Sequence, residues 1–297
     1  MHIKKQIIII NTRFRSNYTN TESTNFIYTL TDVIKKVISM QVIDINISSN
    51  VYTYSDKLGS NSFDISMAPY GRKRIDISNG AYTNEELIDA INNSLDNSGF
   101  SNVKFGSDPI SFKIDVSSNT NFDLDFSYDN SNCNQLLSNL NKDQYTLGWI
   151  MGFRGKYFQK INSKKDKHGC LVEDTESVTN TYSGKNRYVA DTLYENQFGK
   201  YFLLYVNDYQ NNNIKPFICP FNFESSIDNC ILSKLHTSGD EENPYTKNDL
   251  VNPKRIYFGP VDIKKLHITL YDEVGRILDN NNSDYTITLE VEVIYDY

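Results

Sequence analysis

The residues best suited to acid–base chemistry are scattered along the chain. Four histidines are present, at positions 2, 168, 236 and 267. His267 is the strongest candidate for a general base, but it occupies a polar position in an alternating strand pattern, where we expect it to face solvent or a neighbouring subunit. The acidic run at 240–242 lacks the alternate-ligand spacing of a calcium loop and is interpreted as a solvated loop.

The cysteines give no sign of a metal or nucleophile site. They lie at positions 133, 170, 219 and 230, without a CxxC pair, and we expect them to be reduced. His168 and Cys170 are the only Cys/His pair at short spacing, whereas structural zinc needs four ligands. GxSxG, Walker A and GxGxxG motifs are also missing from the sequence. We therefore predict no catalytic residue, no metal and no cofactor.

The charge and hydropathy of the chain exclude two further classes of function. The formal net charge is -7, so the chain as a whole is expected to repel nucleic acid. The basic run at 164–168 is interpreted as a solvated loop. No stretch approaches the roughly 20 apolar residues of a membrane span. The apolar run near the N-terminus is too short for a signal peptide, so we expect a first strand there and a soluble protein at synthesis.

The elements that must position any site are mainly strands. From Tyr285 to Val293 apolar residues fall on every second position, which predicts a half-buried strand. A strand at 266–270 precedes it, and the turn residues at 280–284 predict that the two form an antiparallel pair. Further strands are predicted at 6–11, 25–30, 36–47, 62–65, 74–77, 111–116, 122–126, 201–208 and 230–235.

A different pattern interrupts the strands between residues 80 and 153. Thr83 and Glu86 form a capping box, and apolar residues follow at helical spacing up to Leu95. The strands at 111–116 and 122–126 are predicted to form a hairpin. A second helix is predicted at 133–140, with the single Trp149 closing a small core.

These patterns predict a mainly β protein with an insertion. A jelly-roll β-sandwich is predicted for residues 1–79 and 154–297, carrying an inserted helix–hairpin–helix subdomain at 80–153. The polar stretch at 155–192 is interpreted as a long surface excursion.

Several phrases in a fixed order resemble a family of virion proteins of nucleocytoplasmic large DNA viruses. They span almost the whole chain. The phrases are Asn11-Thr-Arg-Phe-Arg, Thr24-Asn-Phe, Gly80-Ala-Tyr-Thr-Asn-Glu-Glu-Leu, Leu147-Gly-Trp-Ile-Met-Gly-Phe-Arg, Tyr201-Phe-Leu-Leu-Tyr-Val-Asn-Asp, Gly259-Pro-Val-Asp-Ile-Lys-Lys-Leu and Leu270-Tyr-Asp-Glu-Val-Gly.

The resemblance implies a jelly-roll minor capsid protein, with the vertex penton preferred. It implies a structural virion protein without enzymatic activity, made in the host cytoplasm. The implied partners are other copies of the chain in a homopentamer, the major capsid protein and other minor capsid proteins. Residues 1–15, apolar and then basic, are the segment expected to make assembly contacts.

Two other functions remain open at this stage. One is a receptor- or carbohydrate-binding β-sandwich of a spike or fibre, for which exposed tyrosines would make contacts. Packing is expected for Tyr285 and Tyr295, and the tyrosines left open as contacts are Tyr52, Tyr54, Tyr70, Tyr182 and Tyr188. The other is a hydrolase with paired acidic residues on facing strands.

Overall fold

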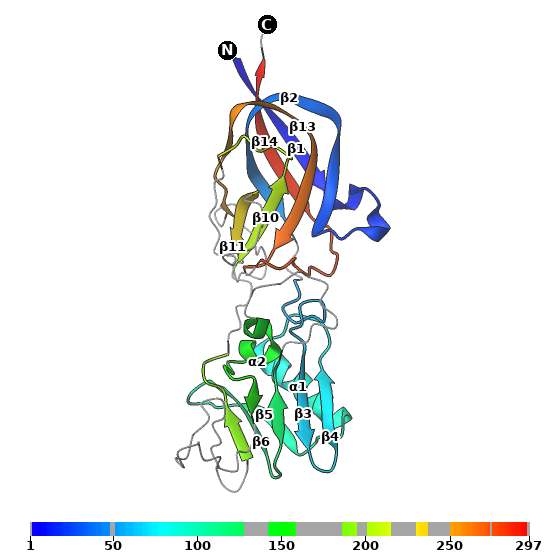
Figure 1. The fold of residues 1–297 in the computed structure, drawn as a ribbon, viewed down its shortest axis with the longest axis vertical. Helices are drawn as coiled ribbons and strands as arrows, with labels where there is room; N and C mark the ends of the chain where they lie inside the picture. The colour runs from blue at the N-terminus through cyan, green and yellow to red at the C-terminus, as the bar shows by residue number, and fades with distance from the viewer. Residues whose placement is uncertain are drawn as a thin grey trace, which may run out of the picture. The chain divides into compact units, whose positions relative to one another are not determined.

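The chain folds into two compact units. The computed structural model describes residues 2–47, 51–127, 142–158, 186–194, 201–214, 230–236, 250–273 and 275–295. Unit 1 comprises Met1–Val51 and Gly199–Tyr297, and unit 2 comprises Tyr52–Phe198. Unit 2 is therefore inserted between two sequence segments of unit 1 (Figure 1).

Unit 1 is built on one antiparallel sheet of seven strands. Its spatial order is β1-β14-β2-β13-β10-β11-β12. The strands are β1 (His2–Asn11), β2 (Asn25–Asn46), β10 (Tyr201–Asn207), β11 (Ile231–His236), β12 (Leu250–Val251), β13 (Arg255–Tyr271) and β14 (Thr286–Tyr295).

The sheet of unit 1 is strongly curved around its core. Figure 1 shows the long strands β2 and β13 bending, and their pairing register shifts at three places. Such irregularities bend a strand and increase its twist. Inward-facing residues at alternate positions, among them Ile287, Leu289 and Val291 of β14, are fully buried in a single apolar cluster. The predicted mainly β, jelly-roll-like fold class is confirmed, with the sheet closing as a half-barrel.

The last two strands are not the antiparallel pair that the sequence predicted. Strand β2 lies between β13 and β14 and is antiparallel to both, so these two strands run parallel to each other. The 280–284 turn is part of a longer connection between β13 and β14, which both pair with β2. The alternation identified both strands, but it carries no information about which strand pairs with which.

Unit 2 combines two small sheets with helices. One sheet has the order β4-β3-β7-β8 and the other β5-β6-β9. Their buried side chains and those of the helices form one apolar cluster. The elements are β3 (Ser62–Met67), β4 (Gly71–Asp76), α1 (Asn84–Asn97), β5 (Val103–Ser107), β6 (Ile114–Ser118), β7 (Asp123–Asp125), η3 (Lys142–Tyr145), α2 (Leu147–Ile150), β8 (Tyr157–Phe158) and β9 (Asn186–Val189).

Helix α1 begins where the sequence predicted. The Thr83 hydroxyl accepts a hydrogen bond from the Glu86 backbone N–H, and the Glu86 carboxylate accepts one from the Thr83 N–H, so the capping box is formed. Leu87, Ile91 and Leu95 are fully buried on its inner face. The sequence also predicted that Trp149 closes a small core. In the structure its ring is instead only half-buried and lies beneath the Arg154 guanidinium.

The inserted unit is larger than the 80–153 that the sequence suggested. Strands β3 and β4, which we assigned to the jelly roll, belong to unit 2, where β3 pairs with β4 on one side and with β7 on the other. Strand β9, also assigned to the jelly roll, pairs with β6. The predicted hairpin of 111–116 with 122–126 is wrong, because β6 and β7 belong to different sheets. Local alternation finds a strand, whereas its partner here lies about 60 residues away in the chain. The second predicted helix, at 133–140, lies outside the described residues.

Candidate assembly surface

Strand β1 forms one edge of the unit 1 sheet. Among the described residues it pairs with β14 alone. Ile8 and Ile10 point into the core and are buried, whereas Ile3, Ile7 and Ile9 lie on the other face and are each more than half exposed. A long edge strand with exposed apolar side chains offers unpaired backbone groups and apolar area to another chain. This edge is therefore a candidate contact surface.

The strands next to β1 carry polar side chains on the same outer face. Lys5 Nζ lies 3.0 Å from Glu290 Oε1, and Gln41 Nε2 donates to the same carboxylate oxygen at 2.9 Å. Glu292 accepts hydrogen bonds from Lys254 Nζ at 2.8 Å and from the Ser39 hydroxyl at 2.7 Å. These contacts, the lysine contact first, lower the pKa of Glu292 below its usual value. The exposed isoleucines of β1 thus border a polar central strip.

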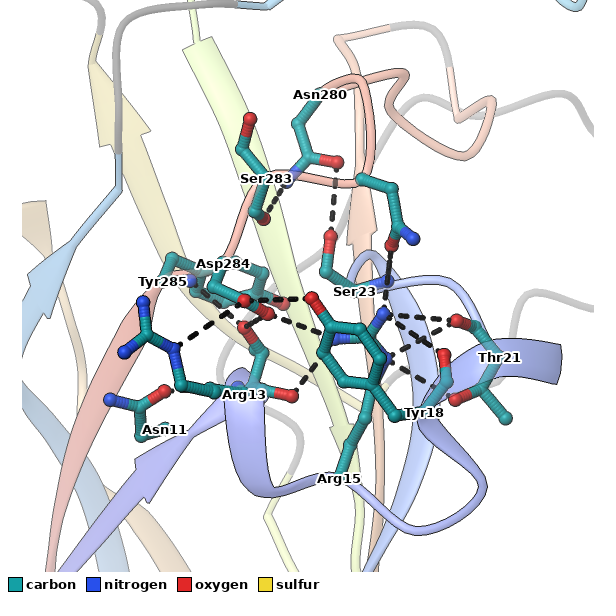
Figure 2. A network of polar contacts seen from close by, with 12 residues as sticks. Asn11, Arg13, Arg15, Tyr18, Thr21, Ser23, Asn280, Ser283, Asp284 and Tyr285 are labelled. Atoms are coloured by element: carbon teal, nitrogen blue, oxygen red, sulfur yellow. Dashed lines mark hydrogen bonds and ion pairs between the residues drawn. The ribbon is translucent and has the colours of Figure 1, made fainter.

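The segment after β1 is held in place by a buried arginine. We call residues 12–24 the Arg15 loop; it includes the short helices η1 (Thr12–Phe14) and η2 (Tyr18–Asn20). The Arg15 side chain is fully buried. Its Nη1 donates to Thr12 O and to Asp284 Oδ1, both at 2.9 Å, and its Nη2 donates to Thr21 O at 3.1 Å and to Asn282 Oδ1 at 3.0 Å (Figure 2). A guanidinium with this many partners is fixed in one geometry.

Further hydrogen bonds tie the Arg15 loop to the turn before β14. Thr12 Oγ1 donates to Asp284 Oδ1 at 2.9 Å, and Tyr18 OH donates to Asp284 Oδ2 at 3.0 Å. The Ser23 backbone N–H donates to Asn282 Oδ1 at 2.8 Å. Figure 2 shows these side chains converging from both segments. Because each contact joins residues far apart in sequence, the loop is fixed against the folded sheet rather than tethered only at its ends.

The fixed loop presents an aromatic ring to solvent. Phe14 is 76% exposed, although Thr12 and Arg15 on either side of it are buried. Arg13 is also exposed, and the Arg15 guanidinium stacks 3.9 Å from the centre of the Tyr18 ring. Aromatic and arginine side chains held in advance in one conformation are typical anchors of protein–protein contacts. β1 and the Arg15 loop together form the surface that we call the assembly edge.

The histidine singled out by the sequence contacts neighbouring strands of its own sheet. His267 Nε2 lies 2.8 Å from Asn25 Oδ1, and its ring meets Tyr205 edge-on. Burial lowers the pKa of His267, so the ring is neutral at neutral pH. The sequence predicted a solvent- or subunit-facing side chain, whereas the ring is half-buried within its own sheet.

A shallow hollow on the β4-β3-β7-β8 sheet brings acidic groups together. Its volume is about 210 Å³, and Asp64, Arg72, Asp125 and Tyr157 are among its lining residues. Arg72 Nε donates to Asp64 Oδ2 at 2.8 Å and Arg72 Nη2 to Asp125 Oδ2 at 2.7 Å. Both carboxylates therefore share one guanidinium.

Within the described ranges, no group of three or more His, Cys, Asp or Glu side chains is arranged to hold a metal ion. None of the helices described is long and apolar enough to cross a membrane. Several sequence candidates lie outside the described residues: the charged runs at 164–168 and 240–242, and Cys133, Cys170 and Cys219. The remaining cysteine, Cys230, is half-buried.

The tyrosines left open by the sequence divide by burial. Tyr54 and Tyr188 are buried, and burial raises the pKa of both. Tyr52 is half-buried, Tyr70 is exposed, and Tyr182 lies outside the described residues. Of the two expected to pack, Tyr285 is buried and Tyr295 half-buried. Because buried side chains are not open to a ligand, Tyr70 and the exposed part of Tyr52 are the members of the predicted contact set that remain among the described residues.

Comparison with known proteins gives likenesses at the level of structure only. No family model matches the chain, and no curated protein matches it. The crystal structure of the mavirus penton protein is similar with a TM-score of 0.43 and 9% identity, covering 99% of this chain and 100% of that one. A chain in the cryo-EM structure of the Sputnik virophage is similar with a TM-score of 0.38 and 14% identity, covering 97% of this chain and 98% of that one.

Proposed function

We propose that the protein is a non-enzymatic structural component of a virus capsid, of the vertex or penton type. The observation that carries the proposal is the assembly edge, where a ten-residue edge strand with exposed isoleucines continues into a loop that holds Phe14 out to solvent. Large rigid apolar groups at a sheet edge are costly to leave exposed in a soluble monomer. The order of sequence phrases described above agrees with this assignment.

The proposed partners are other copies of the chain, in a homopentamer around a five-fold axis, together with major capsid protein and other minor capsid proteins. Identical subunits around an axis meet through the same pair of surfaces at each contact. Unit 1, with its curved sheet, would supply these contacts. Its place of action would be the virion.

The test is the mass of the purified full-length protein in solution, measured by light scattering, with negative-stain images of the same fraction. Wild-type protein is expected to exceed the monomer mass, and an Ile7→Lys/Ile9→Lys variant to return to it, because each lysine would place a charge in the apolar contact. Both positions are exposed, so the melting temperature should change little.

A matched control is Val33→Lys, at an exposed apolar position of β2 away from the edge. It should assemble as the wild type does. A mass equal to that of the monomer for wild-type protein at every concentration, without rings in the images, would contradict the proposal. An Ile7→Lys/Ile9→Lys variant that assembles as well as the wild type would also contradict it.

A further inference from the structure

Unit 1 carries a second exposed apolar patch, away from β1. Ile256 and Phe258 lie at the start of β13, and Ile214 lies beside them. Two backbone hydrogen bonds join the segments: the Ile214 N–H donates to Ile256 O at 2.9 Å, and the Phe258 N–H donates to Asn212 O at 2.8 Å. Ile214 and Ile256 are about half exposed and Phe258 is 76% exposed. Tyr257, between the two β13 residues, points the other way and is buried. We call Ile214, Ile256 and Phe258 the Phe258 patch.

The Phe258 patch and the exposed side of β1 share one face of the sheet. Ile256 is opposite Ser39, Ser39 is opposite Glu292, and Glu292 is opposite Lys5. Directly paired residues project to the same face, and neighbouring strands lie about 4.8 Å apart. Ile256 and Lys5 are thus separated by roughly 14 Å of sheet, occupied by the polar contacts of Glu292 with Ser39 and Lys254.

This arrangement prevents the two apolar regions from covering each other within one molecule. Both belong to the same hydrogen-bonded sheet, in which β14 and β2 separate β1 from β13. A symmetric contact of β1 with β1 would leave the Phe258 patch exposed, and a symmetric contact between two such patches would leave Phe14 exposed. A head-to-tail contact covers both regions with a single type of interface.

We propose that the occupant of the Phe258 patch is the assembly edge of a second copy of this chain, with Phe14 packed against Ile256 and Phe258. The proposal rests on the proposed function and specifies which surfaces meet. Head-to-tail contacts close into a ring when the rotation between subunits allows it.

The test uses two full-length variants, Phe14→Asp and Phe258→Asp, alone and mixed. Each variant keeps one of the two contacting surfaces, so each alone should associate about tenfold or more weakly than the wild type. In an equimolar mixture, the intact patch of the Phe14→Asp variant meets the intact Phe14 of the Phe258→Asp variant. The mixture should therefore form a 1:1 dimer and stop there, because the two remaining surfaces are both disrupted.

Phe112→Asp is the matched control. Phe112 lies in unit 2 and is 68% exposed, so the substitution changes the same residue type at similar exposure. This variant should assemble as the wild type does. All three variants should retain the wild-type melting temperature within a few degrees, since each replaces an exposed side chain.

The outcomes separate the two proposals. A wild-type protein that never associates overturns the proposed function. A wild-type protein that assembles, with a Phe258→Asp variant that assembles equally well, overturns the head-to-tail contact alone. So does an equimolar mixture that stays monomeric while the wild type assembles, because complementary surfaces would then be present without binding.

Discussion

Arg15 and Asp284 form a 2.9 Å ion pair between residues 269 positions apart in the sequence. The arginine is fully buried, whereas the carboxylate keeps a fifth of its surface exposed. Asp284 also accepts hydrogen bonds from Thr12 and Tyr18. The pair thus joins the segment after the first strand to the segment before the last strand, and it determines where Phe14 projects.

Replacing Arg15 by alanine should lower the free energy of unfolding by about 3 kcal/mol, because a buried ion pair loses one partner. The carbonyls of Thr12 and Thr21 lose donors at the same time. Urea unfolding followed by circular dichroism measures the change. Arg13→Ala is the control: Arg13 is 74% exposed and 4.0 Å from Asp284, so its loss should cost less than about 0.5 kcal/mol. Equal effects of the two substitutions would contradict the assigned role of Arg15.

The alternation of residues identified most strands of unit 1 but not their neighbours. Tyr285 to Val293 alternate in burial along β14, as predicted. The predicted strands at 25–30 and 36–47 form one strand, β2, because the residues between them continue it through a bend: Lys36 has a φ of 56° and the pairing with β13 shifts there. Residues 31–35 mix polar and apolar types without strict alternation, and this pattern fits a bend in a continuous strand as well as a loop between two strands.

The assembly edge was only partly predictable. Residues 1–15 were expected to make contacts because they are apolar and then basic, and the exposed isoleucines of β1 lie in this segment. The expectation treated Arg15 as part of a basic arm, whereas it is a buried anchor. Its partners Asn282 and Asp284 looked like ordinary turn residues. The Phe258 patch was not anticipated, because a single exposed aromatic in a strand has no sequence signal.

A second buried ion pair stabilises unit 1 at the start of β13. Arg255 Nη1 donates to Asp208 Oδ2 at 2.9 Å, with both side chains almost fully buried, and Tyr257 OH donates to the same oxygen. Asp208→Ala should therefore cost about 3–5 kcal/mol, because Arg255 would remain as an uncompensated buried charge. Chemical denaturation measures the loss.

Tyr257→Phe is the graded control for that pair. It removes one hydrogen bond to a charged group and keeps the ring, so we expect a cost of about 1.5–3 kcal/mol. Burial raises the pKa of Tyr257, and the Asp208 charge adds to this, so the hydroxyl stays protonated across the working range of pH. A larger loss for Tyr257→Phe than for Asp208→Ala would show that the ion pair is not the main contribution.

Close packing in unit 2 requires glycine at position 148. An added Cβ there would lie 2.7 Å from Phe126 Cδ1, closer than real Cβ contacts. Gly148→Ala should destabilise the protein by about 1–3 kcal/mol through overpacking, although alanine favours helices. Gly259→Ala is the control, since nothing lies within 4 Å of its added Cβ. Thermal unfolding compares the two, and a stabilised Gly148→Ala variant would show that Phe126 can move aside.

His267 should make the stability of unit 1 depend on pH. Burial lowers its folded pKa below the ordinary value of 6.5, so the unfolded chain binds the proton more readily. The contribution is fully present above about pH 6.5 and is lost as the pH falls through the folded pKa. His267→Gln cannot be protonated in this range, and its amide can still donate to Asn25. Melting temperatures between about pH 7.5 and 5 should therefore fall less for the variant than for the wild type. Parallel curves would mean that protonation of His267 does not oppose folding.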